Sequence, residues 1–126
     1  MSNALRTFLV EDSPVIRDSL VAALEEMSPV EVVGIAEDER SAVEWLEGPQ
    51  PPCDLMIVDI FLKGGSGLGV LRAAHGVRAP MKIVVLSNYA SVDIRRKCTE
   101  LGASRVFDKS SEIDALIDYC EQLATA

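Results

Sequence analysis

The sequence predicts an α/β fold, a doubly wound five-stranded parallel sheet with helices on both faces, forming three layers. Short apolar runs alternate with segments of helical periodicity five times along the chain. The connections are short, and no linker, repeat or low-complexity stretch interrupts the pattern. Strict alternation of this kind, with strands that are apolar throughout, is typical of parallel sheets buried on both faces.

Each apolar run is a predicted strand. The third run, Leu55–Asp59, shows the pattern most clearly, because prolines precede it and a glycine-rich loop, residues 64–67, follows it. Its last residue is an acid, and an apolar strand gives no reason of its own for an acid there. The predicted strands are 7–10, 30–36, 55–59, 82–86 and 103–107.

Helices are predicted after each strand. Ser13, which a proline follows, Asp38 and Ser91 are suited to cap helix N-termini, because their side-chain oxygens accept backbone N–H groups that the helix leaves unpaired. Gly102 is suited to end the fourth helix, and the fifth is expected to begin at 110–111. The residues expected to face the sheet are Ile16, Leu20, Ala23, Leu24 and Met27; Ala42, Val43 and Leu46; Leu68, Leu71 and Ala74; Val92, Ile94, Cys98 and Leu101; and Ile113, Leu116, Ile117 and Cys120.

Length and charge limit the classes of function. The 126 residues suffice for one domain, and 1–126 is expected to be that single domain, without an output domain. Residues 2–4 resemble an expression scar. A net charge of −8 argues against direct nucleic-acid binding, which needs a basic surface. No apolar run is long enough to span a membrane and no signal peptide is visible, so a cytoplasmic protein that binds no membrane is expected.

Cysteine and histidine usage narrows the chemistry further. Cys53, Cys98 and Cys120 show neither metal-ligand nor redox spacing and are expected to be small buried residues in a reducing compartment. His75 is the only histidine. A histidine-based zinc site and a Ser-His-Asp triad are therefore disfavoured.

Five chemically active side chains follow the predicted strands. Glu11 and Asp12 follow the first strand, Asp59 ends the third, Ser87 follows the fourth and Lys109 lies just past the fifth. In a parallel sheet the carboxyl ends of the strands meet at one edge, where ligands bind. Three carboxylates, one hydroxyl and one ammonium group are therefore expected to converge.

This combination favours phosphoryl transfer. Three neighbouring carboxylates repel one another unless a cation neutralises them, and Mg²⁺ prefers such oxygen ligands. Lys109 supplies a point charge suited to a phosphoryl oxygen, and Ser87 supplies a hydroxyl donor. Asp59 would attack phosphorus as the nucleophile and become an acyl phosphate.

At these positions the chain resembles the receiver domain of two-component response regulators, over essentially its whole length. The resemblance implies a flavodoxin-like three-layer sandwich with strand order 2-1-3-4-5. It also implies a signalling domain, not a conventional metabolic enzyme, that catalyses its own phosphorylation and slow dephosphorylation. The matching positions are Glu11 and Asp12, Asp59, Ser66 and Gly67, Ser87, and Lys109.

The resemblance also implies a role for each site residue. Asp59 would be the phosphoacceptor, taking the group from a sensor histidine kinase, a phosphotransfer protein or acetyl phosphate. Lys109 would bind the phosphoryl oxygens together with Ser87 and the backbone N–H of Asn88. The expected ligands of Mg²⁺, or of Mn²⁺ as a substitute, are Asp12, Asp59 and the backbone carbonyl of Phe61, with Glu11 acting largely through water.

The sequence departs from the family pattern in three places. Val106 occupies a position where the family usually has an aromatic residue. In the family that residue swings inward when the phosphoryl group recruits the hydroxyl side chain, which is Ser87 here. Phe107 is next to Val106, but neighbouring strand residues face opposite ways. A serine, not the common proline, follows Lys109. Phe61 and Tyr89 are bulky neighbours of the site, and we expect them to restrict the water that would hydrolyse the acyl phosphate.

The sequence leaves other interpretations open, together with one possible assembly. A degenerate receiver, acting as a phosphorylation-independent interaction module, remains the main alternative. A Toprim-type nuclease needs two acids around one residue after its later strand, whereas Ile60 follows Asp59. A flavodoxin is disfavoured because Glu11 and Asp12 would repel the FMN phosphate. A homodimer would use the surface of the fourth helix, fifth strand and fifth helix, where basic residues (95–97, 105) face acidic ones (112, 114, 118).

Overall fold

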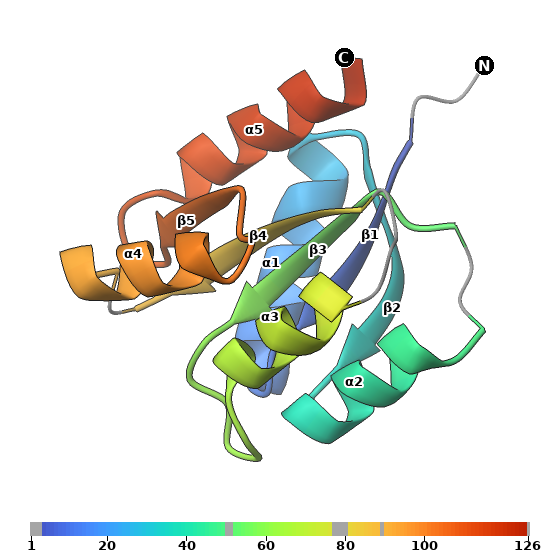
Figure 1. The fold of residues 1–126 in the computed structure, drawn as a ribbon. Helices are drawn as coiled ribbons and strands as arrows, with labels where there is room; N and C mark the ends of the chain where they lie inside the picture. The colour runs from blue at the N-terminus through green and yellow to red at the C-terminus, as the bar shows by residue number, and fades with distance from the viewer. Residues whose placement is uncertain (1–3, 50–51, 77–80, 89, 126) are drawn as a thin grey trace.

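Strands and helices alternate strictly in the computed structural model, which describes residues 4–49, 52–76, 81–88 and 90–125 (Figure 1). Within this part of the chain no helix is both long and apolar enough to cross a membrane. The elements are β1 (Leu5–Val10), α1 (Pro14–Met27), β2 (Val30–Ala36), α2 (Glu39–Glu47), β3 (Leu55–Asp59), α3 (Gly67–Gly76), β4 (Lys82–Ser87), α4 (Val92–Glu100), β5 (Arg105–Asp108) and α5 (Ile113–Thr125).

The five strands form one parallel sheet in the order β2-β1-β3-β4-β5, as predicted. Helices α1 and α5 cover one face and α2, α3 and α4 cover the other (Figure 1). The order of strands reverses between β1 and β3, and ligands of open α/β sheets bind at such a switch point. The predicted three-layer sandwich is therefore confirmed.

Each face of the sheet carries its own hydrophobic core. Neighbouring residues of β5 show the division, because Val106 belongs to the core under α2, α3 and α4, whereas Phe107 belongs to the core under α1 and α5. Phe8 of β1 stacks on Trp45 of α2, with 3.9 Å between ring centroids. All residues of β3 are buried, which explains why that strand is apolar up to its final acid.

The predicted helix caps are present. The side chain of Ser13 accepts the N–H of Ile16, and Ser91 caps α4 in the same way. The Asp38 carboxylate accepts the N–H of Ser41 at 2.8 Å. Gly102, which ends α4, has a φ of 101°, a conformation that favours glycine.

Several details of the sequence prediction were wrong. Ile16, Met27 and Val92 were expected to face the sheet but are 40%, 56% and 72% exposed. Met27 and Val92 are terminal residues of their helices, and Ile16 lines an open pocket between α1 and the start of α5. The fifth helix begins at Ile113, not at 110–111, because that turn bonds to the Asp108 carboxylate instead.

We predict that Gly67→Ala lowers the free energy of unfolding by about 1–3 kcal/mol, as overpacking does elsewhere. A Cβ at Gly67 would collide with the Asp59 carbonyl oxygen and lie 2.7 Å from Ile60 Cα. Urea titration followed by the fluorescence of Trp45, the only tryptophan, measures the change. Gly76→Ala is the matched control, since a Cβ there meets nothing within 4 Å. Equal stability of both variants would contradict this packing.

Candidate functional site

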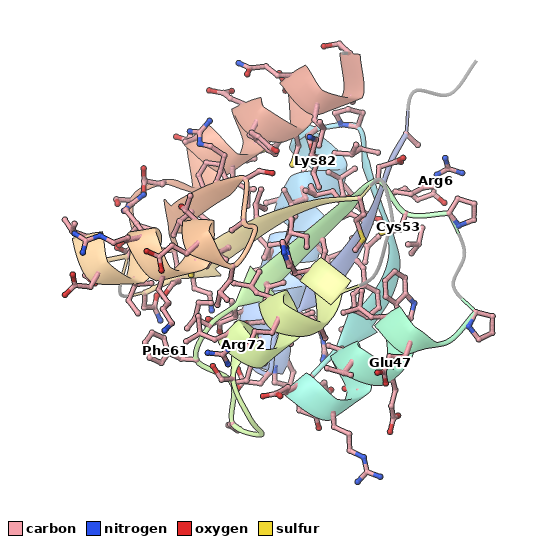
Figure 2. All side chains as sticks on the ribbon, in the orientation of Figure 1. Arg6, Glu47, Cys53, Phe61, Arg72 and Lys82 are labelled. Carbon is pink, nitrogen blue, oxygen red and sulfur yellow. The ribbon has the colours of Figure 1, made fainter. Side chains whose placement is uncertain are left out.

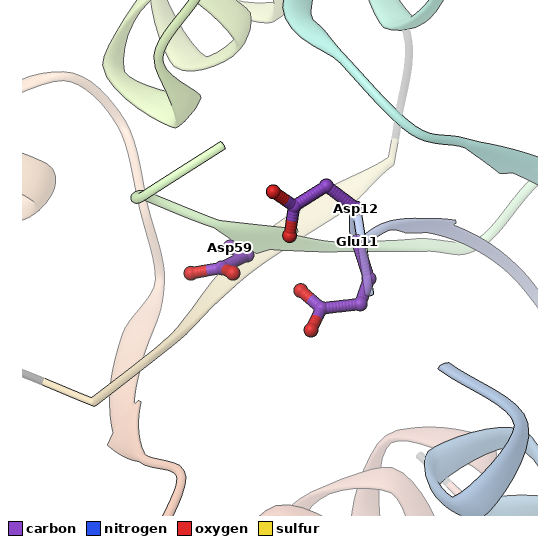
Figure 3. Close-up of side chains that lie close together, drawn as sticks. All are labelled: Glu11, Asp12 and Asp59. Carbon is purple, nitrogen blue, oxygen red and sulfur yellow. The ribbon is translucent and has the colours of Figure 1, made fainter. Parts of the chain in front are cut away.

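Three acids meet where β1 and β3 end. Val10 and Val58 are register partners in the two central strands, so the next residues, Glu11 and Asp59, lie side by side. Asp12 faces the same space, and one carboxylate oxygen of each of the three acids lies within 4.8 Å of the others (Figure 3). Glu11 and Asp59 are buried and Asp12 is half-buried. The structure thus brings together the three acids that the strand ends predicted to be neighbours.

Lys109 joins this group from the end of β5. Its Nζ lies 2.9 Å from Glu11 Oε1, 3.1 Å from Glu11 Oε2 and 2.9 Å from Asp59 Oδ2. The side chain of Lys109 is 9% exposed, so water screens these ion pairs weakly. The ammonium group therefore holds the two buried acids together.

Burial and mutual repulsion shift the ionisation of the group. Burial, together with the hydrogen bond to Asp59, raises the pKa of Glu11 from 4.5 to about 7. Burial alone would lower the pKa of Lys109, but its bonds to Glu11 and Asp59 raise it overall. Lys109 therefore stays charged, and Glu11 takes up a proton at a higher pH than an exposed glutamate does.

Backbone groups of the loop after β3 orient the two aspartates. The N–H of Phe61 donates to Asp59 Oδ1 at 3.2 Å, and the N–H of Lys63 donates to Asp12 Oδ2 at 2.8 Å. Phe61 is 52% exposed, and its side chain lies on the outside of the molecule (Figure 2). Sequence reasoning missed Lys63, because a backbone donor leaves no signal in its side chain.

The remaining candidates lie at the ends of β4 and β5. Ser87 is fully buried, and its carbonyl accepts the N–H of Lys109 at 2.9 Å. Asn88 is exposed and Val106 is buried. Tyr89, the other predicted neighbour of the site, lies outside the described residues. The end of β4 is thus bonded directly to the turn that carries Lys109.

A cluster beside the site was not expected from the sequence. Arg95 of α4 forms an ion pair with Glu112 at 2.6 Å, so these two residues, both assigned to a dimer surface above, are partners within the chain. The carboxylate of Asp108 accepts the backbone N–H groups of the next two serines, forming a tight turn. The run Asp108-Lys109-Ser110-Ser111 carried a signal for that turn, but nothing in the sequence pointed to the ion pair. No described peptide bond is cis, including that between Lys109 and Ser110.

Comparison with known proteins agrees with the fold. The family model described as "Response regulator receiver domain" matches residues 7–121. A probable transcriptional regulatory protein of Picosynechococcus is 33% identical over 98% of this chain and 50% of its own length. Protein-glutamate methylesterase/protein-glutamine glutaminase 5 of Myxococcus xanthus is 29% identical over 90% of this chain and 36% of its own length.

Solved structures show the same fold. The signal receiver domain of the putative response regulator NarL from Mycobacterium tuberculosis superposes with a TM-score of 0.83 at 24% identity, covering 98% of both chains. The present chain spans about a third to a half of the length of the curated relatives. Because the family model matches nearly the whole chain and the acids lie where the strand ends place them, this chain belongs to the response regulator receiver domain family.

Proposed function

We propose that this receiver domain takes a phosphoryl group onto Asp59 from a sensor histidine kinase or a phosphotransfer protein. The observation that carries the proposal is the buried Asp59 carboxylate, set between Glu11 and Asp12 with the Lys109 ammonium 2.9 Å from its Oδ2. A positioned nucleophile beside a fixed positive charge supports phosphoryl transfer, in which positioning and charge stabilisation supply most of the catalysis.

In the proposed reaction an oxygen of Asp59 attacks phosphorus. The P–N bond of the phosphohistidine breaks, the imidazole leaves with the electron pair, and an acyl phosphate forms. With acetyl phosphate the P–O bond breaks and acetate leaves. Lys109 Nζ, already bonded to Asp59, is placed to reach an oxygen of the new phosphoryl group. Ser87 and the backbone N–H of Asn88 supply the other proposed donors.

The acidic group also fits a divalent cation. The three carboxylates each place one oxygen within 4.8 Å of the others, and carboxylate oxygens are ligands that suit Mg²⁺, which usually keeps several waters as well. We propose that Glu11, Asp12, Asp59 and the Phe61 carbonyl hold Mg²⁺, or Mn²⁺ in its place. When bound, the ion would offset the negative charge of the carboxylates and of the incoming phosphoryl group.

We also propose that phosphorylation alters the surface formed by α4, β5 and α5. A partner protein or an output domain would bind that surface. The bond between Lys109 N–H and the Ser87 carbonyl supports this link, because it joins the phosphoryl-binding residues to β5. Several expectations from the sequence stay predictions. They are the phosphorylation-independent module, the homodimer, the single-domain boundaries, the cytoplasmic location, and the slow hydrolysis attributed to Phe61 and Tyr89.

We predict that incubation with acetyl phosphate and Mg²⁺ adds one phosphoryl group to the intact protein, measured by mass spectrometry. Asp59→Asn should gain none, because the nucleophilic oxygen pair is lost. Asp54→Asn is the matched control, since Asp54 lies at the opposite end of β3 and pairs with Arg6. Chelating the cation should slow the reaction at least about tenfold. An unmodified wild-type protein, with acetyl phosphate and with phosphorylated kinases, would favour the degenerate module.

A second prediction concerns pH. Because the pKa of Glu11 is raised from 4.5 to about 7 in the folded protein, the folded state binds more protons than the unfolded state between these values. The stability that Glu11 contributes is therefore fully present below its unfolded pKa and is lost as the pH rises through its folded pKa.

Glu11→Gln removes this dependence. In metal-free buffer, the free energy of unfolding of the wild type minus that of Glu11→Gln should fall by at most about 3 kcal/mol between about pH 5 and pH 8. Urea titrations of both proteins across this range measure the difference. A difference that is constant with pH, or that rises, would show that Glu11 does not retain a proton in the folded protein.

A further inference from the structure

Arg95 of α4 binds three other segments through one guanidinium group. Its Nε donates to the carbonyl of Ala90 at 2.9 Å, Nη1 to the carbonyl of Val106 at 2.8 Å and Nη2 to the carboxylate of Glu112 at 2.6 Å. These acceptors belong to the loop before α4, to β5 and to the residue before α5. A planar group with its donors in fixed directions can hold three segments at once, whereas a single ammonium is a compact point charge.

Hydrogen bonds within the turn after β5 tie its residues to one another. The Asp108 carboxylate accepts both the N–H and the hydroxyl of Ser110. Glu112 donates its N–H to the Asp108 carbonyl, and its Oε1 accepts the Asp108 N–H at 2.9 Å. That same oxygen accepts Nη2 of Arg95. Lys109 lies within this turn, so a displacement of Lys109 is passed to Glu112 and from there to Arg95.

The second route from the site to Arg95 runs through the end of β4. Ser87, the proposed hydroxyl donor, is three residues before Ala90, whose carbonyl Arg95 holds. The Ser87 carbonyl in turn accepts the N–H of Lys109. The loop after β4 and the turn after β5, which carry the proposed phosphoryl-binding groups, therefore both bond to the Arg95 side chain of α4.

The side chain at Val106 is poorly suited to carry the signal. It is buried, short and β-branched, so its χ1 rotamer is restricted. Its backbone carbonyl, by contrast, is bonded to Arg95 on β5, the last strand of the sheet. A shift of β5 therefore acts on α4 through Arg95 without any rotation of a side chain on β5.

We propose that Arg95, paired with Glu112, is the positioning residue that couples phosphorylation of Asp59 to movement of α4. The proposal rests on the proposed function, since it needs a phosphoryl group on Asp59. When Lys109 and Ser87 shift toward that group, the Glu112 carboxylate and the Ala90 carbonyl shift with their loops. Arg95 follows them, and α4, which carries Arg95, changes its position or its population of states.

The test compares hydrogen exchange of residues 90–108 before and after loading with acetyl phosphate and Mg²⁺, with phosphate occupancy measured on the same samples by intact mass. In the wild type, loading should change exchange in α4. Arg95→Ala should load at a rate within about twofold of the wild type, yet its loading-dependent change in α4 should shrink at least about fivefold. A merely structural role for Arg95 would alter exchange in both states and leave the difference between them intact.

Three further variants sharpen the test. Arg95→Lys keeps the charge but not the planar group and should behave like Arg95→Ala. Glu112→Gln keeps an acceptor for the Asp108 N–H while removing the ion pair, so an intermediate response is expected, and it serves if Arg95→Ala fails to fold. Arg96→Ala, an exposed neighbour outside these bonds, should respond like the wild type.

The outcomes separate the two proposals. The role of Arg95 would be overturned if loaded Arg95→Ala showed the full wild-type change of hydrogen exchange in α4, and phosphorylation of Asp59 would still stand. If Arg95→Ala does not fold, the same result for loaded Glu112→Gln would overturn that role. A wild type that loads but shows no change in α4 would overturn it as well. A wild type that does not load would overturn the proposed function and, with it, the coupling.

Discussion

The buried ion pairs of Lys109 with Glu11 and Asp59 are the interaction on which the site depends. Each partner comes from the carboxyl end of a different strand, β5, β1 and β3, so the contact forms only when the parallel sheet is complete. An isolated charge in this position would be costly, because burial removes its hydration. The one ammonium group faces two carboxylates, and burial, together with the hydrogen bond to Asp59, raises the pKa of Glu11 in spite of the ammonium. This acidic group is the part of the site where we propose that a cation binds.

The fold and the acidic group were predictable because both follow from periodicity and from the geometry of parallel strands. Apolar strands such as Leu55–Asp59 reveal the sheet, and strand ends reveal Glu11, Asp12, Asp59 and Lys109 as neighbours. Helix ends were less predictable, since the apolar stripe that marks a buried face includes terminal residues such as Met27 and Val92 that the sheet does not cover. The contact of Arg95 with Glu112 could not be predicted from the sequence, because only the packing of α4 beside β5 brings these two residues together.

Charge pairing inside the chain also changes how the α4-β5-α5 surface is understood. Arg95 and Glu112 use their charges on each other, and Arg105 lies over the rings of Phe107 and Tyr119 at 5.1 and 5.7 Å. A surface that looked in the sequence like complementary patches for a second copy is thus partly committed to internal contacts. Those contacts connect the two loops of the site to α4, through which we propose that phosphorylation of Asp59 reaches the surface.

In the proposed mechanism, Lys109 exchanges its bond to Asp59 Oδ2 for a bond to an oxygen of the new phosphoryl group. A crystal structure of the protein loaded with Mg²⁺ and beryllofluoride, a mimic of the phosphoryl group, tests it most directly. The account predicts beryllium bonded to the Asp59 carboxylate, Lys109 Nζ bonded to a fluorine, and a shift of the Arg95 guanidinium together with Glu112. Beryllofluoride absent from Asp59, with Lys109 still bonded to Glu11 and Asp59 as it is now, would contradict it.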